Sequence, residues 1–338
     1  TVQGTIQCIS TNLEIGITAS MRAKIEEEGG ITLPARVLLE YIQLLPAETI
    51  TVSTEGTDVL IQSKSQKTKI RGTGVDDFPA LPPITTQETA EVSAGDLHAA
   101  LTEVVFAAAQ DENRVDISGV YASFTPGDPQ GQCTLAATDS YRLAERSITT
   151  IHGPKGEIAV IIPSRTAHEL LRITGDQSED AAVALHIGAH QLSVQVGEVT
   201  LLSRLIEGTY PNYRAIIPTT AATRVVAGRE DMMQAVKRAS LFVRPGINDI
   251  TLHFAADAKV ITVSAGNSQL GEHEESVVGE FRGGDQTIVF NYRYVLDGLN
   301  VMDTDDIVFE VNNNTSPVVV RPKGEEQGHL YLIMPIKQ

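Results

Sequence analysis

The sequence predicts an α+β protein made of three copies of one domain, with two helices in each copy packed on antiparallel sheets. The first observation is a strand-like run that leads into an amphipathic helix with an Arg near its first turn. This run recurs around Pro34, Pro163 and Asn291, at intervals of 129 and 128 residues. Internal repeats of this kind decide the architecture of a chain before any single element does.

The second observation is a short turn signal that recurs with the same period. It lies at Thr11, Thr138 and Gly266, at intervals of 127 and 128 residues. Because two separate elements recur in step, we predict three homologous domains. Their expected ranges are residues 1–88 for domain I, 89–219 for domain II and 220–338 for domain III.

Repeat one is shorter at its start than the other two. Only ten residues precede Thr11, whereas a strand-like stretch and a helical pattern lie ahead of Thr138 in repeat two. We therefore expect repeat one to lack its opening strand and first helix, and we interpret this as a truncated or misannotated start. Its second helix is expected after Pro34.

Repeats two and three open alike. Val92–Leu97 and Val226–Asp231 each read as a strand end followed by apolar residues at helical spacing. Strand pairs follow, as in Gly119–Phe124 and Ile250–Phe254. Proline fixes the backbone angle φ and stiffens a joint, so two proline-containing stretches are expected to connect the repeats. These stretches are residues 77–83 and 208–214.

Composition restricts the class of protein. Apolar residues make up 42% of the chain and charged residues 20%, enough for an ordinary core in each domain. There is no apolar run of ~18 residues and no signal peptide at the start, so neither a membrane span nor export is expected. Cys8 and Cys133 lie in strand-like runs of different repeats, which favours two buried thiols in a reducing cytoplasm.

No catalytic, metal or cofactor motif is present. The eight His show no HExxH pattern and the two Cys no CxxC pattern. The sequence Gly72-Thr73-Gly74 indicates a turn, and His273-Glu274-Glu275 indicates a polar surface. Asp139 is expected to accept hydrogen bonds in a turn between strands and not to act as a base. We therefore expect no enzyme activity and no cofactor.

Two alternatives stay open at this point. A carboxylate- and Mg²⁺-dependent nuclease or phosphatase would need paired acids converging on a cleft, and the sequence shows no such pair. A scaffold protein without DNA would share the repeats. The net charge of −17 argues against tight DNA binding, which uses Lys and Arg on phosphates, unless the cations are gathered on one face.

Four segments, in this order and spacing, resemble the bacterial DNA polymerase III β subunit family, the β sliding clamps. They are residues 137–144, 210–214, 290–297 and 332–338. The resemblance covers essentially the whole chain and implies three domains of the DNA clamp fold in a head-to-tail homodimeric ring. It implies a non-enzymatic processivity factor that encircles double-stranded DNA without sequence preference. The implied partners are the polymerase III α subunit, the clamp loader and other proteins that carry a clamp-binding motif.

The resemblance also implies a cleft between domains II and III that takes a short partner peptide with apolar and aromatic anchors. Apolar residues would form its walls, and polar residues would bind the peptide backbone or a Gln side chain. The residues are Arg114, Ile117, Thr138, Ser140, Tyr141, Arg142, Leu143, Pro211, Ile216, Asn291, Tyr294, Leu332, Ile333, Met334, Pro335 and Ile336. Chain ends are usually polar unless they are docked, so an apolar end supports a binding role.

Two further sets complete the prediction. Cations on or beside the repeated helices are expected to face DNA: Arg36, Arg165, Arg172, Lys237, Arg238 and Arg293. Complementary charges and apolar residues of domains I and III are expected to meet in the dimer: Lys67, Lys69, Ile70, Leu241, Phe242, Glu272, Glu274 and Glu275. Rim ion pairs contribute little each, so the apolar members should carry most of the affinity.

Overall fold

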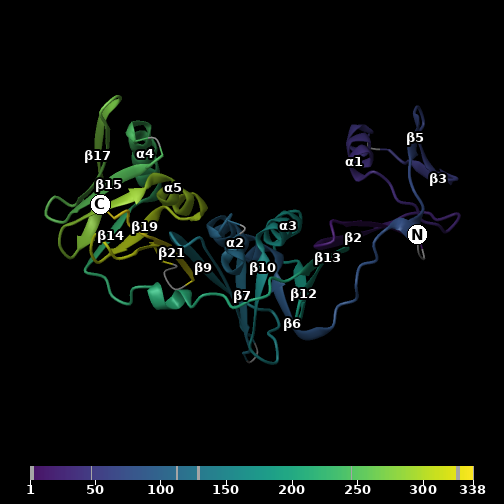
Figure 1. Ribbon diagram of the computed structural model, residues 1–338, viewed down its shortest axis with the longest axis horizontal. Coiled ribbons are helices and arrows are strands. Elements are labelled where there is room, and N and C mark those ends of the chain that lie inside the picture. The colour runs from purple at the N-terminus through teal and green to yellow at the C-terminus, as the bar shows by residue number, and fades with distance from the viewer. Residues whose placement is uncertain are drawn as a thin grey trace.

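Three lobes follow one another along an arc, with domain I at one end, domain II in the middle and domain III at the other end (Figure 1). The computed structural model describes residues 4–46, 48–111, 113–127, 130–244, 246–324 and 328–337. The α-helices lie along the inner side of the arc, and the strands extend outward from them (Figure 1).

Domain I contains one α-helix within the described residues. Its elements are β1 (Thr5–Thr11), β2 (Ile15–Arg22), α1 (Ala35–Leu44), β3 (Thr51–Glu55), β4 (Asp58–Gln62), β5 (Lys67–Arg71) and the 3₁₀ turn η1 (Val75–Asp77). The helix expected after Pro34 is therefore present. None of its residues is buried, and Leu39 and Leu44 are 59% and 82% exposed.

Domain II contains two helices that pack on each other. Its elements are β6 (Thr86–Ser93), α2 (Ala94–Val104), η2 (Val105–Ala107), η3 (Val115–Ile117), β7 (Gly119–Thr125), β8 (Gln132–Thr138), β9 (Arg142–Thr149), β10 (Ile158–Pro163), α3 (Ser164–Gly175), β11 (Ala182–Gly188), β12 (Gln191–Val196) and β13 (Val199–Arg204). Helix α2 begins where Ser93 accepts a hydrogen bond from the Asp96 amide at 3.0 Å, which satisfies a free N–H of the first turn.

Domain III repeats this plan after the linker turn η4 (Tyr213–Ile216). Its elements are β14 (Thr223–Gly228), α4 (Arg229–Ala239), η5 (Ser240–Phe242), β15 (Asp249–Ala255), β16 (Val260–Asn267), β17 (Gly271–Arg282), β18 (Gln286–Asn291), α5 (Tyr292–Val301), β19 (Asp306–Val311), β20 (Val318–Pro322) and β21 (His329–Ile333). Asn291 caps α5 by accepting a hydrogen bond from the Arg293 amide at 3.0 Å. The helices and strand pairs expected in repeats two and three are confirmed.

The sheets run across the domain boundaries. One sheet has the order β1-β2-β13-β12-β11-β6, so the last strand of domain II pairs with a strand of domain I. A longer sheet has the order β10-β7-β8-β9-β21-β20-β19-β14-β17-β16-β15-β18, so the last strand of domain III pairs with β9 of domain II. Strands β3, β4 and β5 form a sheet of their own in domain I.

The prediction of two buried thiols is right for one cysteine and wrong for the other. Cys133 is 1% exposed in β8, and burial raises the pKa of its thiol to about 12. Cys8 is exposed on β1, a strand with a pairing partner on one side only. A strand-like pattern shows alternation, but it does not show whether a second layer covers the side chain.

Candidate partner-binding site between domains II and III

The loop from Thr138 to Arg142 presents Tyr141 at the surface. The Asp139 carboxylate accepts hydrogen bonds from the backbone N–H groups of Tyr141 (2.9 Å) and Arg142 (3.0 Å), which is the turn role expected for it. The Thr138 hydroxyl donates to the Arg142 carbonyl at 2.6 Å and accepts from the Ser140 amide. Ser140 takes the left-handed conformation, with φ 78°, and Tyr141 is 61% exposed.

The Arg142 guanidinium joins this loop to domain III. It donates to Asp139 at 3.0 Å, to Asp297 of α5 at 2.5 Å and to the Phe106 carbonyl at 2.9 Å. The rings of Phe106 and Tyr294 lie at 5.3 and 4.8 Å from its central carbon, within the range of cation–π attraction. Its side chain is 13% exposed, so most of Arg142 lies behind the surface.

The last described residues lie along the same loop. After β21, the Met334 amide donates to the Tyr141 carbonyl and the Ile336 amide donates to the Val289 carbonyl, both at 2.8 Å. Met334, Pro335 and Ile336 are partly exposed. The apolar end of the chain is therefore docked between domain II and strand β18 of domain III.

The apolar residues expected to line the cleft divide into two groups. Ile117, Leu143, Leu332 and Ile333 are at most 2% exposed and belong to the core, so their expected role as open walls is corrected. Two other side chains of the expected cleft are open to solvent: Ile216 is 48% exposed, and Pro211 is also exposed. We refer to Tyr141, Pro211, Ile216 and Met334 as the apolar and aromatic rim; Met334 packs against the buried cluster that contains Leu143 and Leu332.

The polar residues of the expected cleft lie at both sides of the Tyr141 loop. Arg114 is within 3.5 Å of the Ser140 hydroxyl and 3.4 Å of the Asp116 carboxylate. Across the junction, the Tyr294 ring stacks on Tyr141 with centroids 6.4 Å apart and an interplanar angle of 18°. Thr138 is 8% exposed and its hydroxyl bonds within the loop, and the Asn291 side-chain oxygen caps α5.

Sequence reasoning missed the aromatic support beneath this surface. The Tyr210 and Tyr213 rings of the interdomain linker pack on Tyr121, with centroids 5.1 and 6.0 Å away. The Tyr213 hydroxyl donates to Glu145 of β9, and Arg214 lies 3.5 Å from the same carboxylate. The sequence at residues 210–214 indicated a joint between repeats and a resemblance to the clamp family. Only the fold shows that this motif anchors the linker to the outer face of the sheet.

The cations expected to face DNA all lie on helices, but three of them are paired with a carboxylate of the same chain. Arg165 and Lys237 are exposed on α3 and α4. Arg36 pairs with Glu40 at 2.8 Å, Arg172 with Glu169 at 2.5 Å, and Arg238 with Glu275 at 2.6 Å. Arg293 lies 5.8 Å from the Tyr292 ring.

The predicted interface residues lie at the two ends of the arc. Lys67 and Lys69 are exposed on β5, and Glu272 and Glu274 are exposed on β17. Leu241 is 70% exposed, and the Phe242 ring stacks on His273 at 5.6 Å. Glu275, on the same strand, is held by Arg238.

Ile70 requires a correction. It was expected at the apolar centre of the interface, but it is 6% exposed and packs with Val59 and Ile61 in the core of domain I. Alternate residues of β5 point to opposite faces, so the strand that exposes Lys67 and Lys69 must turn Ile70 inward.

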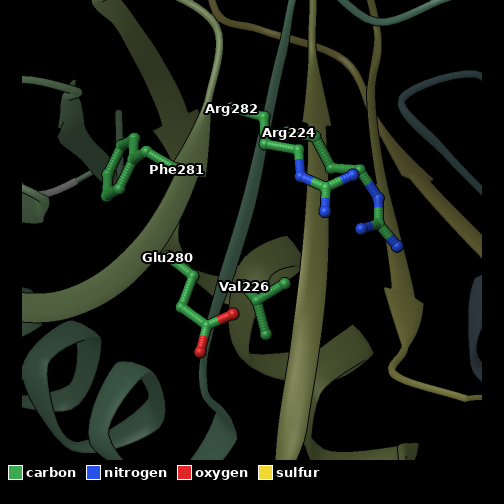
Figure 2. A pocket seen from close by; sticks show the side chains of 5 residues that line it. All are labelled: Arg224, Val226, Glu280, Phe281 and Arg282. Atoms are coloured by element: carbon green, nitrogen blue, oxygen red, sulfur yellow. The ribbon is translucent and has the colours of Figure 1, made fainter.

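A hollow of about 210 Å³ lies elsewhere, on strands β14 and β17 of domain III. Figure 2 shows Arg224 and Arg282 side by side from these neighbouring strands, with Glu280 and Val226 below them. None of the residues that line it belongs to the expected cleft.

Comparison with known proteins decides the family. Three family models match along the chain: the N-terminal domain of the DNA polymerase III beta subunit at residues 2–82, its central domain at 91–212 and its C-terminal domain at 214–337. The "Beta sliding clamp" of Synechococcus elongatus is 33% identical over 331 residues, covering 96% of this chain and 86% of that protein. The chain belongs to the bacterial β sliding clamp family.

Solved clamp structures have the same fold. A DNA polymerase sliding clamp from Pseudomonas aeruginosa, crystallised with a ligand, is 25% identical, with a TM-score of 0.93 over 100% of this chain and 90% of that one. The DNA polymerase III beta subunit of Thermotoga maritima is 26% identical, with a TM-score of 0.91 over 99% of this chain and 89% of that one.

Clamp membership settles the functional class. The chain is a DNA sliding clamp, and clamps are non-catalytic processivity factors, so the prediction that it is not an enzyme is confirmed and the nuclease or phosphatase alternative is set aside. No helix in the described ranges has the length and hydropathy of a membrane span.

A buried polar group supports the clamp's junction from the side of α2. Arg146 of β9 lies 3.2 Å from the Glu103 carboxylate, and His329 of β21 lies 3.5 Å from the same carboxylate. The His329 side chain is fully buried, and burial, with the nearby Arg146 and Arg321 charges, lowers its pKa from 6.5 to about 3. His329 is therefore neutral at pH 7.

This pKa predicts a specific loss of stability in acid. Between pH 6.5 and 3 the unfolded chain protonates His329 and the folded chain does not, so the contribution is complete above pH 6.5 and declines as the pH falls. The slope is about 1.4 kcal/mol per pH unit. Urea unfolding of His329→Leu should show a smaller loss between pH 7 and 5 than wild type, whereas His190→Gln, at an exposed histidine, should not. Equal slopes in wild type and His329→Leu would contradict the assignment.

Proposed function

We propose that two copies of this chain form a head-to-tail ring around duplex DNA and hold the polymerase III α subunit, the clamp loader and other motif-bearing proteins through the surface between domains II and III. The ring proposal rests on an antiparallel strand pairing between neighbouring domains, here called a seam, which occurs twice within the chain. It predicts how a third seam would form between copies.

In each seam, the last strand of one domain pairs with a strand of the domain before it. Strand β13 pairs with β2, with Ser203 opposite Ile15, and β21 pairs with β9, with Ile333 opposite Arg142. Both pairs are antiparallel. In both, the accepting strand follows directly after the turn signal of the repeat.

The hydrogen bonds beyond the strands repeat as well. The Arg204 amide donates to the Glu14 carbonyl at 3.0 Å, and the Met334 amide donates to the Tyr141 carbonyl at 2.8 Å. Two junctions with no partner strand in common thus share one backbone geometry. The same geometry is the simplest expectation wherever these two strands meet.

A third seam has its two strands at opposite ends of the arc. Strand β5 is the last strand of domain I and, among the described residues, pairs only with β4. Strand β17 follows the third turn signal, and β14 pairs only with its last four residues, from Gly279 to Arg282. One edge of β17 pairs with β16. On the opposite edge, which β14 occupies at one end, the residues from Gly271 to Val278 have no strand partner within the described chain. Exposed edges of this kind favour pairing with another chain.

Internal homology sets the register of this third pairing. Ser203 precedes the Tyr-Pro pair at position 210 by seven residues, and Arg71 precedes the Phe-Pro pair at position 78 by seven. Arg142 and Leu270 each lie three residues after the Asp139 or Asn267 of their turn. Arg71 is therefore expected opposite Leu270 of the second copy.

This register brings opposite charges together. Counting along antiparallel strands places Lys69 opposite Glu272 and Lys67 opposite Glu274, all four exposed. Such cross-strand pairs contribute roughly 0.2–1 kcal/mol each. Leu241 and Leu270, 70% and 60% exposed, would supply apolar contact beside them.

The charge of the chain fits a ring that slides. A closed ring holds DNA by topology, so strong phosphate contacts are unnecessary and would slow movement. Exposed cations such as Arg165 and Lys237 lie on the helices of the inner side of the arc (Figure 1). The net charge of −17 belongs to the whole molecule and does not prevent a weakly cationic inner surface.

The junction surface fits a short peptide with apolar anchors. Tyr141, Ile216 and Met334 offer aromatic and aliphatic contact, and the thioether of Met334 adapts to different partners. Arg114 and Ser140 stand beside them as hydrogen-bonding groups. The buried residues beneath give this rim a rigid base.

Retention on DNA tests the ring directly. Clamp loaded onto nicked circular plasmid should stay bound through gel filtration and be released when the plasmid is cut. Arg165→Glu should shorten retention at raised salt, because a helix cation that faces phosphate becomes an anion. The control Arg282→Glu, on the outer strands, should not shorten retention. Equal retention on circular and linear DNA would refute encirclement.

Peptide binding tests the junction surface. A fluorescently labelled peptide with one glutamine and two apolar anchors, one of them aromatic, should bind wild type. Met334→Ala should weaken binding by about 2 kcal/mol, as expected for a central anchor contact. Val278→Ala, at a residue 77% exposed on β17, is the matched control and should bind normally. Unchanged affinity after removal of residues 334–338 would exclude this surface.

A charge exchange tests the register of the ring. Lys67→Glu or Glu274→Lys alone should raise the dimer dissociation constant in sedimentation equilibrium, roughly twofold to tenfold, because one attraction becomes a repulsion. The double variant Lys67→Glu with Glu274→Lys should recover most of the loss. The mismatched double variant Lys67→Glu with Glu272→Lys should recover less, and an equal recovery would contradict the register.

A further inference from the structure

We propose that Arg142 is a positioning residue: it does not touch the partner peptide but holds the Tyr141 loop of domain II and helix α5 of domain III in one arrangement that forms the peptide surface. This inference rests on the proposed peptide site. It assigns a different role to a residue that the sequence places in the cleft itself.

The geometry engages all three nitrogens of the guanidinium within the protein. Nε, Nη1 and Nη2 each donate to a protein oxygen, on Asp139, Asp297 and Phe106 respectively. Aromatic rings flank it on two elements, Phe106 of η2 and Tyr294 of α5. A planar guanidinium held at its edge and beside two rings is oriented rigidly.

Two of these contacts, those with Asp139 and Tyr294, lead to Tyr141. The Asp139 carboxylate that binds the guanidinium also binds the Tyr141 amide, so it fixes the turn. The Tyr294 ring that flanks the guanidinium also stacks on the Tyr141 ring. The Tyr141 carbonyl in turn receives the Met334 amide. Loss of the guanidinium would therefore loosen both the loop and the end of the chain.

The junction between domains I and II shows that the seam itself does not need an arginine. Ile15 occupies the position of Arg142 there: it lies three residues after Asn12, and the Asn12 side chain accepts from the Ile15 amide at 2.8 Å. Ile15 is 9% exposed and packs in the apolar core. The strand pairing and the turn form equally well, so the added function of Arg142 is to fix α5 against the loop.

A second arginine of the same strand provides a matched control. Arg146 is four residues further along β9, is also mostly buried and also pairs with a carboxylate, Glu103 of α2. Arg142→Met and Arg146→Met each remove one buried cation from the same seam. The first removes contacts to Asp139 of the Tyr141 loop and to Asp297 of α5, and the second removes the contact to Glu103 of α2.

The experiment measures binding and local order in both variants of the full chain. With the labelled peptide described above, fluorescence anisotropy should show roughly tenfold weaker binding by Arg142→Met, within the range of couplings between a distant group and a binding site. Arg146→Met should bind within about twofold of wild type. Hydrogen exchange followed by mass spectrometry should show faster exchange of the segment 334–337 in Arg142→Met only.

Each outcome decides the proposal. Wild-type affinity in Arg142→Met, or an equal loss in Arg146→Met, would overturn it, since the effect would then be absent or a matter of general stability. If Arg142→Met does not fold, Asp297→Asn removes the partner charge without changing size, and an unchanged affinity and exchange in that variant would overturn the proposal. A wild-type chain that fails to bind peptide would count against the proposed site, and hydrogen exchange at the Met334 amide would still decide the role of Arg142.

Discussion

Strand pairing across the domain boundaries is the constraint on which the rest of the structure depends. Strands β13 and β21 each complete a sheet of the preceding domain, so the relative orientation of neighbouring domains is fixed by backbone hydrogen bonds. A one-residue slip would move every side chain of the strand to the other face, so the register is strongly specified. Repetition of one orientation produces the arc and sets all helices along its inner side (Figure 1).

The two junctions share this backbone and differ in side-chain chemistry. Apolar residues such as Ile15 fill the first, whereas Arg142 and Arg146 face carboxylates in the second. Burying a charge costs free energy that its partner only partly returns, so ionic groups at one of two equivalent seams point to a requirement beyond stability. We infer that the requirement is a defined binding surface between domains II and III. Of the two described junctions, this is the one where the apolar end of the chain is also docked.

Much of the fold follows from local signals. The helices after Pro34, Pro163 and Asn291 and the turn at Asp139 form where periodicity and short-range hydrogen bonding predict them. The exposure of the residues in the candidate site was harder to predict from the sequence. Leu143 and Leu332 carry the composition of a ligand-binding wall, yet they lie under the linker rings Tyr210 and Tyr213. Burial depends on what packs above a residue, and that partner comes from a distant part of the chain.

The sequence alone determined the three repeats, the helix and strand types, the absence of a catalytic motif and the presence of cations on the repeated helices. Each of these depends on spacing along the chain, which a single sequence records completely. Only the tertiary structure decided that Ile70 is core, that Cys8 is exposed and that Arg142 binds Asp297 across 155 positions of sequence. These properties depend on which faces meet after folding, and pairs so distant leave no periodic signal in the sequence.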